Sequence, residues 1–311
     1  MQRAPGSILA LIVLCSCATR EPVTPAGSSL PSNPLAPPPL ALPSEQPINR
    51  GAGRGDYLFV TIRLEDGEAL PFVLDTGSGA TIFDKVFAPQ LGKNHGSVTL
   101  SRFGVRTKSF IFDRPKFYLG GAQLQFTGQY VATYDFSRES AHAGRTIMGL
   151  IGMDCLSHYV LQLDFDAGKM RFLDRASLDT SKLGVPYFLV PYRGRPVLSG
   201  GCLMGGDGED ALIDTGTKVD GGLNTELFED EARRGSINVS TNTPLAGEPK
   251  FAAITRCDWN GGVYTNLIVA NIKGENLIGL RFLARHLVTL DFPDGRLYLK
   301  QTRSGPLAGA H

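Results

Sequence analysis

The alternation of hydrophobic and polar positions beyond residue 50 is typical of short β-strands joined by tight turns. The segment Tyr57–Leu64 is rich in β-branched and aromatic residues, which favours a strand. Leu70–Leu74 is an almost continuous apolar run, as expected for a buried strand, and Asp66-Gly67 between the two segments is a hairpin turn. The pattern therefore predicts a strand pair whose buried second strand ends directly before Asp75.

Two short helices are predicted among the strands, each with a capping residue before it and a glycine after it. They are Lys85–Leu91, between Asp84 and Gly92, and Glu226–Arg234, between Thr225 and Gly235. Helix content is therefore expected to be low.

The chain contains an internal repeat with matched parts in the same order, which is the signature of a duplicated unit. The first copy contains Asp66-Gly67-Glu68, Asp75-Thr76-Gly77-Ser78, Leu150-Ile151-Gly152 and a hairpin with its turn at Ala167-Gly168. The second contains Asp207-Gly208-Glu209, Asp214-Thr215-Gly216-Thr217, Leu277-Ile278-Gly279 and a hairpin with its turn at Asp294-Gly295. Several ordered matches indicate duplication much more strongly than one Asp-Thr-Gly would.

These features predict an all-β protein with two β-barrel-like lobes related by a pseudo-two-fold axis and separated by a cleft. The first lobe is expected over residues 51–176 and the second over residues 177–303. The last residues, 304–311, are expected to form a frayed tail.

Composition narrows the class of partner. The chain has 311 residues, a net charge of +1 and 37 glycines. A nearly neutral chain without a Lys/Arg run gives no reason to expect a nucleic acid as partner. The glycine content suits an all-β protein with many tight turns.

The N-terminus has the features of an export signal. Residues 8–14 are apolar but too short to span a bilayer, and Leu14-Cys15-Ser16-Cys17 follows. This resembles a bacterial lipobox, which predicts a signal peptide over residues 1–17 and a lipid on Cys17. A plain secretory signal with incidental cysteines is the alternative. The resemblance predicts a lipid-anchored protein of the bacterial envelope that faces the periplasm, at the outer membrane rather than the inner one.

Residues 18–50 hold nine of the 20 prolines, mixed with serine and alanine. Such a segment cannot bury enough apolar surface to offset its ordering entropy, so it is expected to be a disordered tether. Beyond it, Cys155 occupies the repeat position of Phe282 and is expected to be a buried thiol. A disulfide between Cys202 and Cys257 remains open.

Two matched carboxylates at the ends of buried strands suit an enzyme in which two acids share one proton. Hydrolysis of a peptide bond needs a base to activate a water and an acid to protonate the carbonyl oxygen. Because two close carboxylates repel each other, one stays protonated while the other is charged. Asp75 and Asp214 are the candidate pair, and the sequence does not show which one holds the proton.

At these residues the chain resembles an aspartic peptidase. Each half is similar to one lobe of the bacterial retropepsin-like aspartyl proteases, and the tandem arrangement is similar to that of pepsin. The resemblance covers everything after the tether and implies an aspartic endopeptidase without cofactor or metal. Its partner would be a peptide or protein substrate, and the chain would be a monomer that forms an internal pseudo-dimer.

The resemblance also implies roles for the residues around the pair. The loop glycines would let the backbone approach the carboxylates, the threonines would bond across to the opposite loop, and the next hydroxyls would bond the outer carboxylate oxygens. In this order the positions are Gly77 and Gly216, Thr76 and Thr215, and Ser78 and Thr217. Gly152 and Gly279 are expected to be structural.

The flap that covers the substrate in pepsin-like enzymes is harder to locate. The candidate in the first lobe is Ser97–Lys108, which lacks the tyrosine of the family, and the second lobe offers Ser240–Phe251. Tyr118 is a weak alternative and fits a core strand better. Lys218 follows the second loop, where it would either lower the pKa of a nearby acid or lie solvated at the cleft rim.

Other chemistries find little support. The sequence contains no His-Glu-x-x-His zinc motif and no Gly-x-Ser-x-Gly elbow, and Cys155 near His158 occupies a core position. The alternatives to an endopeptidase are a catalytically silent peptide-binding lipoprotein on the same fold and a purely structural envelope protein.

Overall fold

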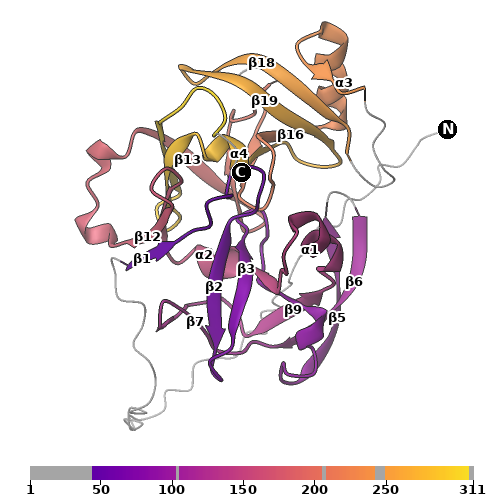
Figure 1. Cartoon of the computed structure of the whole chain (residues 1–311), viewed down its shortest axis with the longest axis vertical. Helices are drawn as coiled ribbons and strands as arrows, with labels where there is room; N and C mark the ends of the chain where they lie inside the picture. Colours follow the sequence, from indigo (N-terminus) through magenta and orange to yellow (C-terminus); the bar gives the residue numbers. More distant parts are fainter. Residues whose placement is uncertain (1–43, 103–104, 205–207, 242–248, 308–311) are drawn as a thin grey trace, which may run out of the picture.

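The computed structural model describes residues 44–102, 105–204, 208–241 and 249–307. The predicted signal peptide, Cys17, the tether up to residue 43 and Asp207 lie outside these residues. Strands dominate the described residues and form one sheet of nine strands and one of thirteen (Figure 1). The predicted all-β class with two lobes is confirmed, although within these residues both sheets are open and neither closes into a barrel.

The nine-stranded sheet builds the first lobe in the order β5-β6-β9-β4-β10-β3-β2-β7-β8. Its strands are β2 (Phe59–Leu64), β3 (Ala69–Leu74), β4 (Ile82–Asp84), β5 (Asn94–Arg102), β6 (Val105–Asp113), β7 (Phe117–Leu119), β8 (Ala122–Gln123), β9 (Tyr130–Tyr134) and β10 (Gly149–Ile151). The turn between β2 and β3 falls at Asp66-Gly67, where Gly67 has a φ of 89°, as the sequence predicted.

The thirteen-stranded sheet has the order β1-β12-β11-β21-β22-β13-β14-β15-β20-β16-β19-β18-β17. The strands before the second lobe are β1 (Ser44–Pro47), β11 (Val160–Asp164) and β12 (Lys169–Leu173). The remainder are β13 (Val185–Tyr192), β14 (Arg195–Leu198), β15 (Ala211–Asp214), β16 (Gly221–Asn224), β17 (Asn238–Val239), β18 (Phe251–Trp259), β19 (Gly262–Ile272), β20 (Leu277–Gly279), β21 (His286–Asp291) and β22 (Arg296–Gln301).

The two lobes repeat the same strand topology. The central order is β9-β4-β10-β3-β2 in the first lobe and β19-β16-β20-β15-β14 in the second. In both lobes the strand that leads to the aspartate runs parallel to the Leu-Ile-Gly strand, and the next pair is antiparallel. The duplication seen in the sequence is therefore a duplication of the fold, with corresponding elements in corresponding places.

The lobes are joined by hydrogen-bonded strands. The hairpin of β11 and β12 belongs to the first half of the chain, but β11 pairs with β21 of the second half. The two hairpins turn at Gly168, with a φ of 67°, and at Gly295, with a φ of 59°, as their sequences predicted. This shared segment holds the halves in one orientation.

The four α-helices of the described residues are short: α1 (Ser137–Ala143), α2 (Met153–Leu156), α3 (Thr225–Arg234) and α4 (Leu280–Leu283). The helix predicted over Lys85–Leu91 is only a 3-10 turn, η1 (Lys85–Phe87), capped by the Asp84 carboxylate. Two more 3-10 turns, η2 (Arg175–Ser177) and η3 (Thr180–Lys182), follow β12. None of these helices is long and apolar enough to cross a membrane.

The ends of the described chain are more ordered than the sequence suggested. Strand β1 falls within the stretch predicted as a disordered tether, yet it pairs with β12, and Glu45 forms ion pairs with Lys169 and Arg171. At the other end, where a frayed tail was predicted, the carbonyl of Ser304 accepts a hydrogen bond from Arg285 at 2.8 Å, and Leu307 is buried. Composition could not predict either contact, because each depends on residues that are far away in the sequence.

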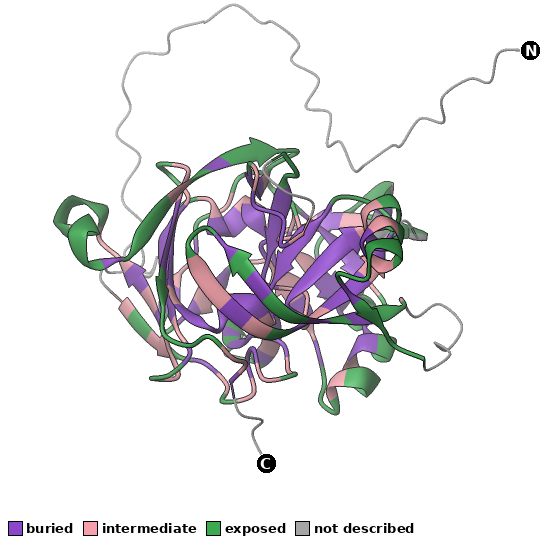
Figure 2. Ribbon diagram, turned by 90° about the horizontal axis from the view of Figure 1, so that it is seen from above, coloured by how far each residue is buried: buried purple, intermediate pink, exposed green. Residues whose placement is uncertain are grey.

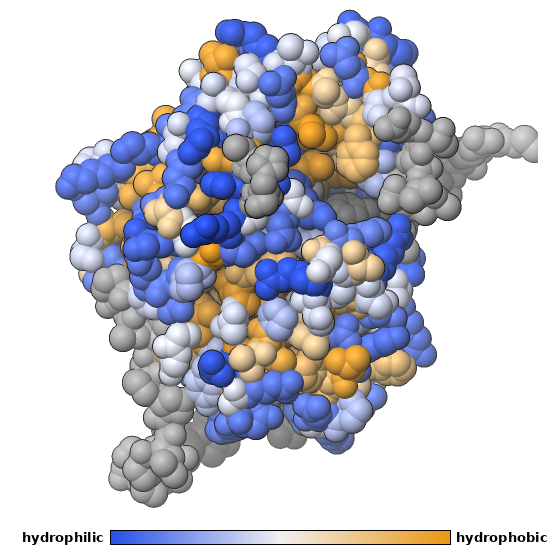
Figure 3. Space-filling model, viewed as in Figure 1, coloured by the Kyte–Doolittle hydropathy of each residue, from blue (hydrophilic) through white to orange (hydrophobic). Residues whose placement is uncertain are grey.

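One large apolar cluster runs through both lobes, with smaller clusters beside it. Aromatic rings fill its two ends: Phe72, Phe83 and Phe117 in the first lobe, and Trp259 with Phe282 in the second. Figure 2 shows buried residues along the strands in the middle of the molecule and exposed residues on its outer strands and helices. On the face in Figure 3, hydrophobic side chains reach the surface in separate patches among hydrophilic ones.

Candidate active site

Each loop aspartate stands at the end of a buried strand, beside the Leu-Ile-Gly strand of its own lobe. Asp75 directly follows β3, and its backbone N–H donates to the Ile151 carbonyl on β10 at 3.0 Å. Asp214 is the last residue of β15 and pairs with Gly279 of β20. The parallel pairing in each lobe therefore fixes the point at which the aspartate leaves the sheet.

The loop glycines show that the two aspartates belong to one site. A methyl group on Gly77 would lie 2.5 Å from the carboxyl carbon of Asp214, and one on Gly216 would lie 2.4 Å from that of Asp75. Each glycine thus packs against the carboxyl group of the opposite lobe. Since each glycine is two residues from its own aspartate, this crossed packing brings both carboxyl groups to the junction of the lobes.

Each loop also binds its own carboxylate through the glycine backbone. The Gly77 N–H donates to Oδ1 of Asp75 at 2.9 Å, and the Gly216 N–H donates to Oδ1 of Asp214 at 2.8 Å. Asp214 is buried and Asp75 is half-buried. The sequence expectation that glycine permits this backbone approach agrees with the geometry.

Thr76 and Thr215 form the cross-lobe hydrogen bonds that the resemblance implied. Oγ1 of Thr76 donates to the Ile213 carbonyl at 2.6 Å, and Oγ1 of Thr215 donates to the Leu74 carbonyl at 2.8 Å. Each hydroxyl also accepts the backbone N–H of the other threonine, at 3.0 and 3.1 Å. Both side chains are completely buried, so four reciprocal hydrogen bonds hold the loops together.

The hydroxyl residues after the glycines differ between the lobes. Oγ1 of Thr217 donates to Oδ2 of Asp214 at 2.7 Å, as expected. Oγ of Ser78 instead donates to the Ala80 carbonyl at 2.7 Å, so the role predicted for Ser78 is wrong. The physical reason is that a serine rotamer can satisfy the tight turn that follows it, and this turn places a carbonyl within reach.

The Leu-Ile-Gly segments support the loops from below in a matched way. The Met153 N–H donates to the Ser78 carbonyl at 2.9 Å, and the Leu280 N–H donates to the Thr217 carbonyl at 2.8 Å. A methyl group on Gly152 would lie 2.4 Å from the Ala80 carbonyl oxygen, and one on Gly279 would lie 2.2 Å from that of Val219. The close approach requires glycine at both positions.

Buried polar groups beneath the loops were missed by sequence reasoning. Six residues after each loop aspartate stands a completely buried side chain, Thr81 or Asp220. Thr81 donates to Asp154 at 2.7 Å, and Asp220 forms ion pairs with Arg281 at 3.2 Å and with Arg285 at 2.8 Å. Burial raises the pKa of Asp220, and the two guanidinium groups oppose this rise.

The repeat could have revealed these buried polar groups. Thr81 and Asp220 occupy matched positions, and so do their partners Asp154 and Arg281, which stand two residues after the glycine of each Leu-Ile-Gly motif. Burial raises the pKa of Asp154, and the Thr81 hydroxyl opposes the rise. The lobes therefore support equivalent loops with different chemistry, a hydroxyl–carboxyl contact in one and an ion-pair cluster in the other.

Lys218 crosses from the second loop to the first lobe. Its Nζ lies 4.7 Å from the centre of the Tyr57 ring, and the side chain is half-buried. Tyr57 is buried and precedes β2. The lysine is thus held over an aromatic face at the lobe junction, which is more specific than a solvated position at a rim.

The flap candidate of the first lobe is a hairpin. Strands β5 and β6 pair in antiparallel fashion over the range predicted, and its tip, residues 103–104, lies outside the described residues. Tyr118 lies in strand β7, as the core-strand interpretation predicted. Most of the candidate in the second lobe, residues 242–248, lies outside the described residues as well.

The three described cysteines are buried free thiols. Burial raises the pKa of Cys155 well above its usual value and the pKa of Cys202 and Cys257 to about 11. Cys257 donates to the Leu203 carbonyl at 3.2 Å, and no disulfide joins it to Cys202. His158 bonds the Thr127 hydroxyl at 3.1 Å. Cys155 is therefore a structural thiol, as predicted.

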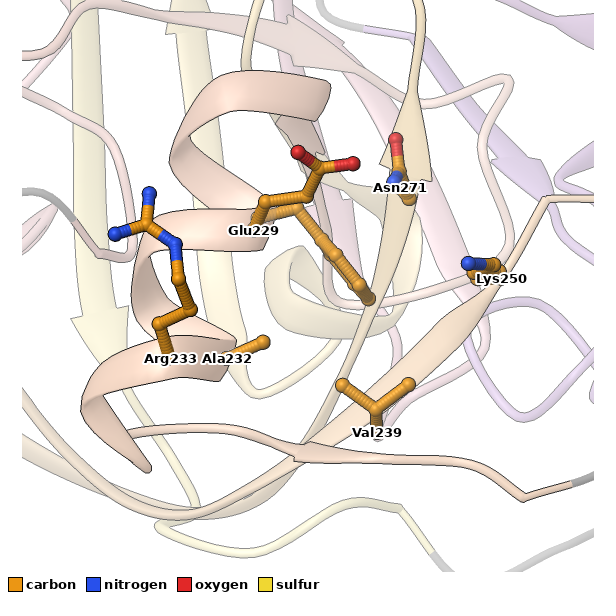
Figure 4. Close-up of a pocket in the computed structure, with 7 residues that line it drawn as sticks. Glu229, Ala232, Arg233, Val239, Lys250 and Asn271 are labelled. Carbon is orange, nitrogen blue, oxygen red and sulfur yellow. The ribbon is translucent and has the colours of Figure 1, made fainter.

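A separate surface pocket of about 340 Å³ lies beside α3 in the second lobe (Figure 4). Helix α3 supplies Glu229 and Arg233, and strands β17 and β19 supply Val239 and Asn271. None of its lining residues belongs to the aspartate loops. In the described part of the chain, no group of three or more His, Cys, Asp or Glu side chains is arranged to hold a metal ion.

Comparison with known proteins supports the fold. No protein-family profile matches the chain, and no curated protein matches it in sequence. Among solved structures, the aspartic proteinase from Irpex lacteus is similar, with a TM-score of 0.53 and 12% identity. The match covers 84% of this chain and 98% of that one. The chain therefore has the fold of an aspartic proteinase, as the sequence resemblance predicted.

Proposed function

We propose that this protein is an aspartic endopeptidase in which Asp75 and Asp214 activate one water between them. The observation that carries the proposal is the crossed packing of Gly77 on Asp214 and of Gly216 on Asp75. This packing supports a shared site to which each lobe contributes one carboxyl group. The cross-lobe bonds of the two threonines keep the loops in that position.

The chemistry follows from the repulsion between the two acids. Two carboxylates about 3 Å apart at an effective dielectric near 20 repel each other by roughly 5 kcal/mol, so one stays protonated while the other is charged. The charged member takes a proton from the water as it attacks the peptide carbonyl. The protonated member gives its proton to the carbonyl oxygen, and proton return to the leaving nitrogen completes hydrolysis.

The surrounding hydrogen bonds suit a pair with one charged and one protonated carboxyl group. Glycine N–H groups on Oδ1 of both acids orient the carboxyl planes. Thr217 adds a second donor, to Oδ2 of Asp214. Hydrogen bonds to a carboxylate favour its charged form. Fixed donors of this kind need no rearrangement as charge moves in the transition state.

The direct test uses single substitutions of the two acids. Asp75→Asn and Asp214→Asn should each abolish cleavage of an unfolded protein, while circular dichroism and the melting temperature show an intact fold. Asp258→Asn is the matched control, because Asp258 is an exposed aspartate and lies outside both loops. Retention of cleavage in both loop variants would reject the assignment.

The alternative is a peptide-binding protein that does not turn over its ligand. The absence of a tyrosine from the flap candidate, residues 97–108, favours it. A peptide with a secondary alcohol in place of the scissile carbonyl would bind in both cases. Binding of that peptide by the wild-type chain, without cleavage of any unfolded protein between pH 3 and 7, would establish the alternative.

We further propose that the chain acts in the bacterial cell envelope and faces the periplasm, anchored through a lipid on Cys17, at the outer membrane rather than the inner one. The support is the lipobox-like Leu14-Cys15-Ser16-Cys17 and the proline-rich stretch that follows it. Metabolic labelling with a palmitate analogue should mark the wild-type chain and leave Cys17→Ala unlabelled. Equal labelling of both would exclude this anchor.

A further inference from the structure

Two contacts beside the aspartate pair are related by the internal repeat. Lys218 stands four residues after Asp214, and Gly79 stands four residues after Asp75. Each touches the opposite lobe at a residue two positions before the first strand of the repeated pair. These partners are Tyr57, before β2, and Arg193, before β14. The two contacts are thus equivalent positions in the two lobes.

The first contact places a cation on an aromatic ring. Nζ of Lys218 lies 4.7 Å from the Tyr57 ring centre, and the side chain is half-buried. Tyr57 is itself fixed, because its ring packs edge-on against Phe59 at 6.3 Å. Lys218 directly follows Thr217, whose hydroxyl donates to Asp214. The ammonium group is therefore held against the first lobe by a residue that directly follows the second aspartate loop.

The second contact also carries a cation and an aromatic ring. A methyl group on Gly79 would lie 3.6 Å from the Arg193 carbonyl oxygen, so the β13–β14 turn rests beside the first loop. The guanidinium of Arg193 lies 4.9 Å from the Tyr192 ring centre, and Arg193 is exposed. The neighbouring Arg195 is already paired with Glu275 at 2.7 Å. The available cation at this contact is therefore Arg193.

The two lobes repeat one strand topology and the two contacts hold equivalent places in it, so we expect them on opposite sides of the aspartate pair. An extended peptide advances about 3.4 Å per residue. A chain that crosses both aspartates would therefore reach Lys218 within a few residues on one side of its scissile bond. It would reach Arg193 within a few residues on the other side.

Neither cation has a carboxylate partner among the residues that the structure describes. A half-buried ammonium group has lost part of its hydration, and an aromatic face compensates only part of that loss. A carboxylate from a ligand would complete the compensation and could form charge-assisted hydrogen bonds. The Lys218 contact thus favours an acidic side chain from a bound peptide, and the exposed Arg193 guanidinium can pair with one through charge-assisted hydrogen bonds.

We propose that the cleft selects peptides with acidic side chains on both sides of the scissile bond, bound by Lys218 and Arg193. This inference rests on the proposed endopeptidase function. It names Lys218 and Arg193 as specificity-determining residues, with no part in the proton transfers. Gly79, which offers no side chain, leaves room for the substrate beside Arg193.

The test compares four peptides that share one cleavable core and carry Glu or Gln two to four residues from the bond on each side. With the wild-type chain, each Glu→Gln change in the peptide should lower kcat/KM about threefold, the scale of a partly exposed ion pair, and both together about tenfold. Raising the salt from 50 to 500 mM should reduce the preference, because salt screens exposed pairs.

Variants then assign each preference to one residue. Lys218→Gln should remove the preference for Glu on one side only, and Arg193→Gln should remove it on the other side only. Lys300→Gln is the matched control, because Lys300 is an exposed cation at the far end of β22, and it should keep both preferences. Loss of both preferences in one single variant would contradict the assignment.

The outcomes also separate this inference from the proposed function. Cleavage of all four peptides at equal rates would overturn the acidic preference and leave the endopeptidase intact. If no peptide is cleaved, binding is measured by calorimetry with versions of the four peptides whose scissile bond is reduced and cannot be cleaved. Tighter binding of the Glu–Glu form to the wild type, together with equal binding of all forms to the double variant Lys218→Gln/Arg193→Gln, would support the acidic preference without turnover. Equal binding of all forms to the wild type would overturn it.

Discussion

The hydroxyl residues Ser78 and Thr217 occupy equivalent positions in the repeat but donate to different acceptors. Thr217 donates to the Asp214 carboxylate and Ser78 to the Ala80 carbonyl. A hydroxyl has one proton to donate, so only Thr217 contributes this bond to the aspartate pair. The asymmetry gives the two loops different roles in holding the charge.

Replacing Thr217 should therefore disturb the pair more than replacing Ser78. Thr217→Val removes a donor to the ionised carboxylate, so we expect the acidic limb of the kcat/KM profile to move upward by about one pH unit. A hydrogen bond to a charged group is worth about 1.5–3 kcal/mol, and a water that takes the place of the hydroxyl would recover part of that energy. Ser78→Ala should leave that limb in place. Equal shifts in the two variants would contradict the asymmetric hydrogen bonding.

The cross-lobe threonines allow a second prediction at this scale. Thr76→Val keeps the shape of the side chain but leaves the Ile213 carbonyl and the Thr215 N–H without their buried partner. We expect a loss of about 2–4 kcal/mol in the free energy of unfolding, measured with urea. Thr225→Val, on the surface of α3, is the control and should cost much less. A loss below 1 kcal/mol for Thr76→Val would show that the cross-lobe hydrogen bonds contribute little to stability.

At the scale of elements, helix α3 shows where sequence rules identify an element but not its exact start. Its end was predicted correctly, because Gly235 adopts a left-handed φ of 73°. Its N-cap was expected at Thr225 but is Asn224, whose side chain accepts the Leu227 N–H at 2.9 Å. Both residue types are good caps, and the choice depends on β16 running directly into the helix.

The cap can be tested directly. Asn224→Ala should lower the free energy of unfolding by about 1 kcal/mol, because the first turn of α3 loses its acceptor. Asn224→Asp keeps an acceptor oxygen and places a negative charge at the helix N-terminus, so it should retain most of the stability. Equal losses in both variants would show that the acceptor oxygen of Asn224 is not the source of its contribution to stability.

The extent of sequence prediction follows from how local each feature is. The aspartate loops and the hairpin turns were predictable because a few adjacent residues determine them. The pairing of β1 and the cluster around Asp220 were not, since each depends on residues brought together by the fold. The Ser78 hydroxyl bonds a carbonyl only two residues away, but this choice over the Asp75 carboxylate depends on the exact conformation of the loop. Asp220 was the nearest to being found, because it and Thr81 share a position in the repeat.

At the scale of the whole molecule, the two lobes share a sheet and a core, so a buried ionisable group in either affects the stability of both. His286 begins β21 within this core, and its ring bonds the Tyr264 hydroxyl at 2.7 Å and the Phe282 carbonyl at 3.1 Å. Burial lowers the pKa of His286 to about 4, with Arg285 beside it contributing in the same direction. The histidine is therefore neutral in the folded protein above that pH.

This burial should limit stability in mildly acidic solution. The unfolded chain binds a proton to His286 below about pH 6.5, whereas the folded chain does so only near pH 4, so stability falls as the pH drops through this window. The full difference corresponds to about 3 kcal/mol. In urea titrations, His286→Gln should flatten the dependence of the free energy of unfolding between pH 6.5 and 4. His142→Gln, which changes an exposed residue of α1, should not flatten it.

If wild type and His286→Gln lost stability in parallel across this pH window, another group would be responsible. In that case, His286 would not limit the acidic range in which the proposed hydrolysis can proceed.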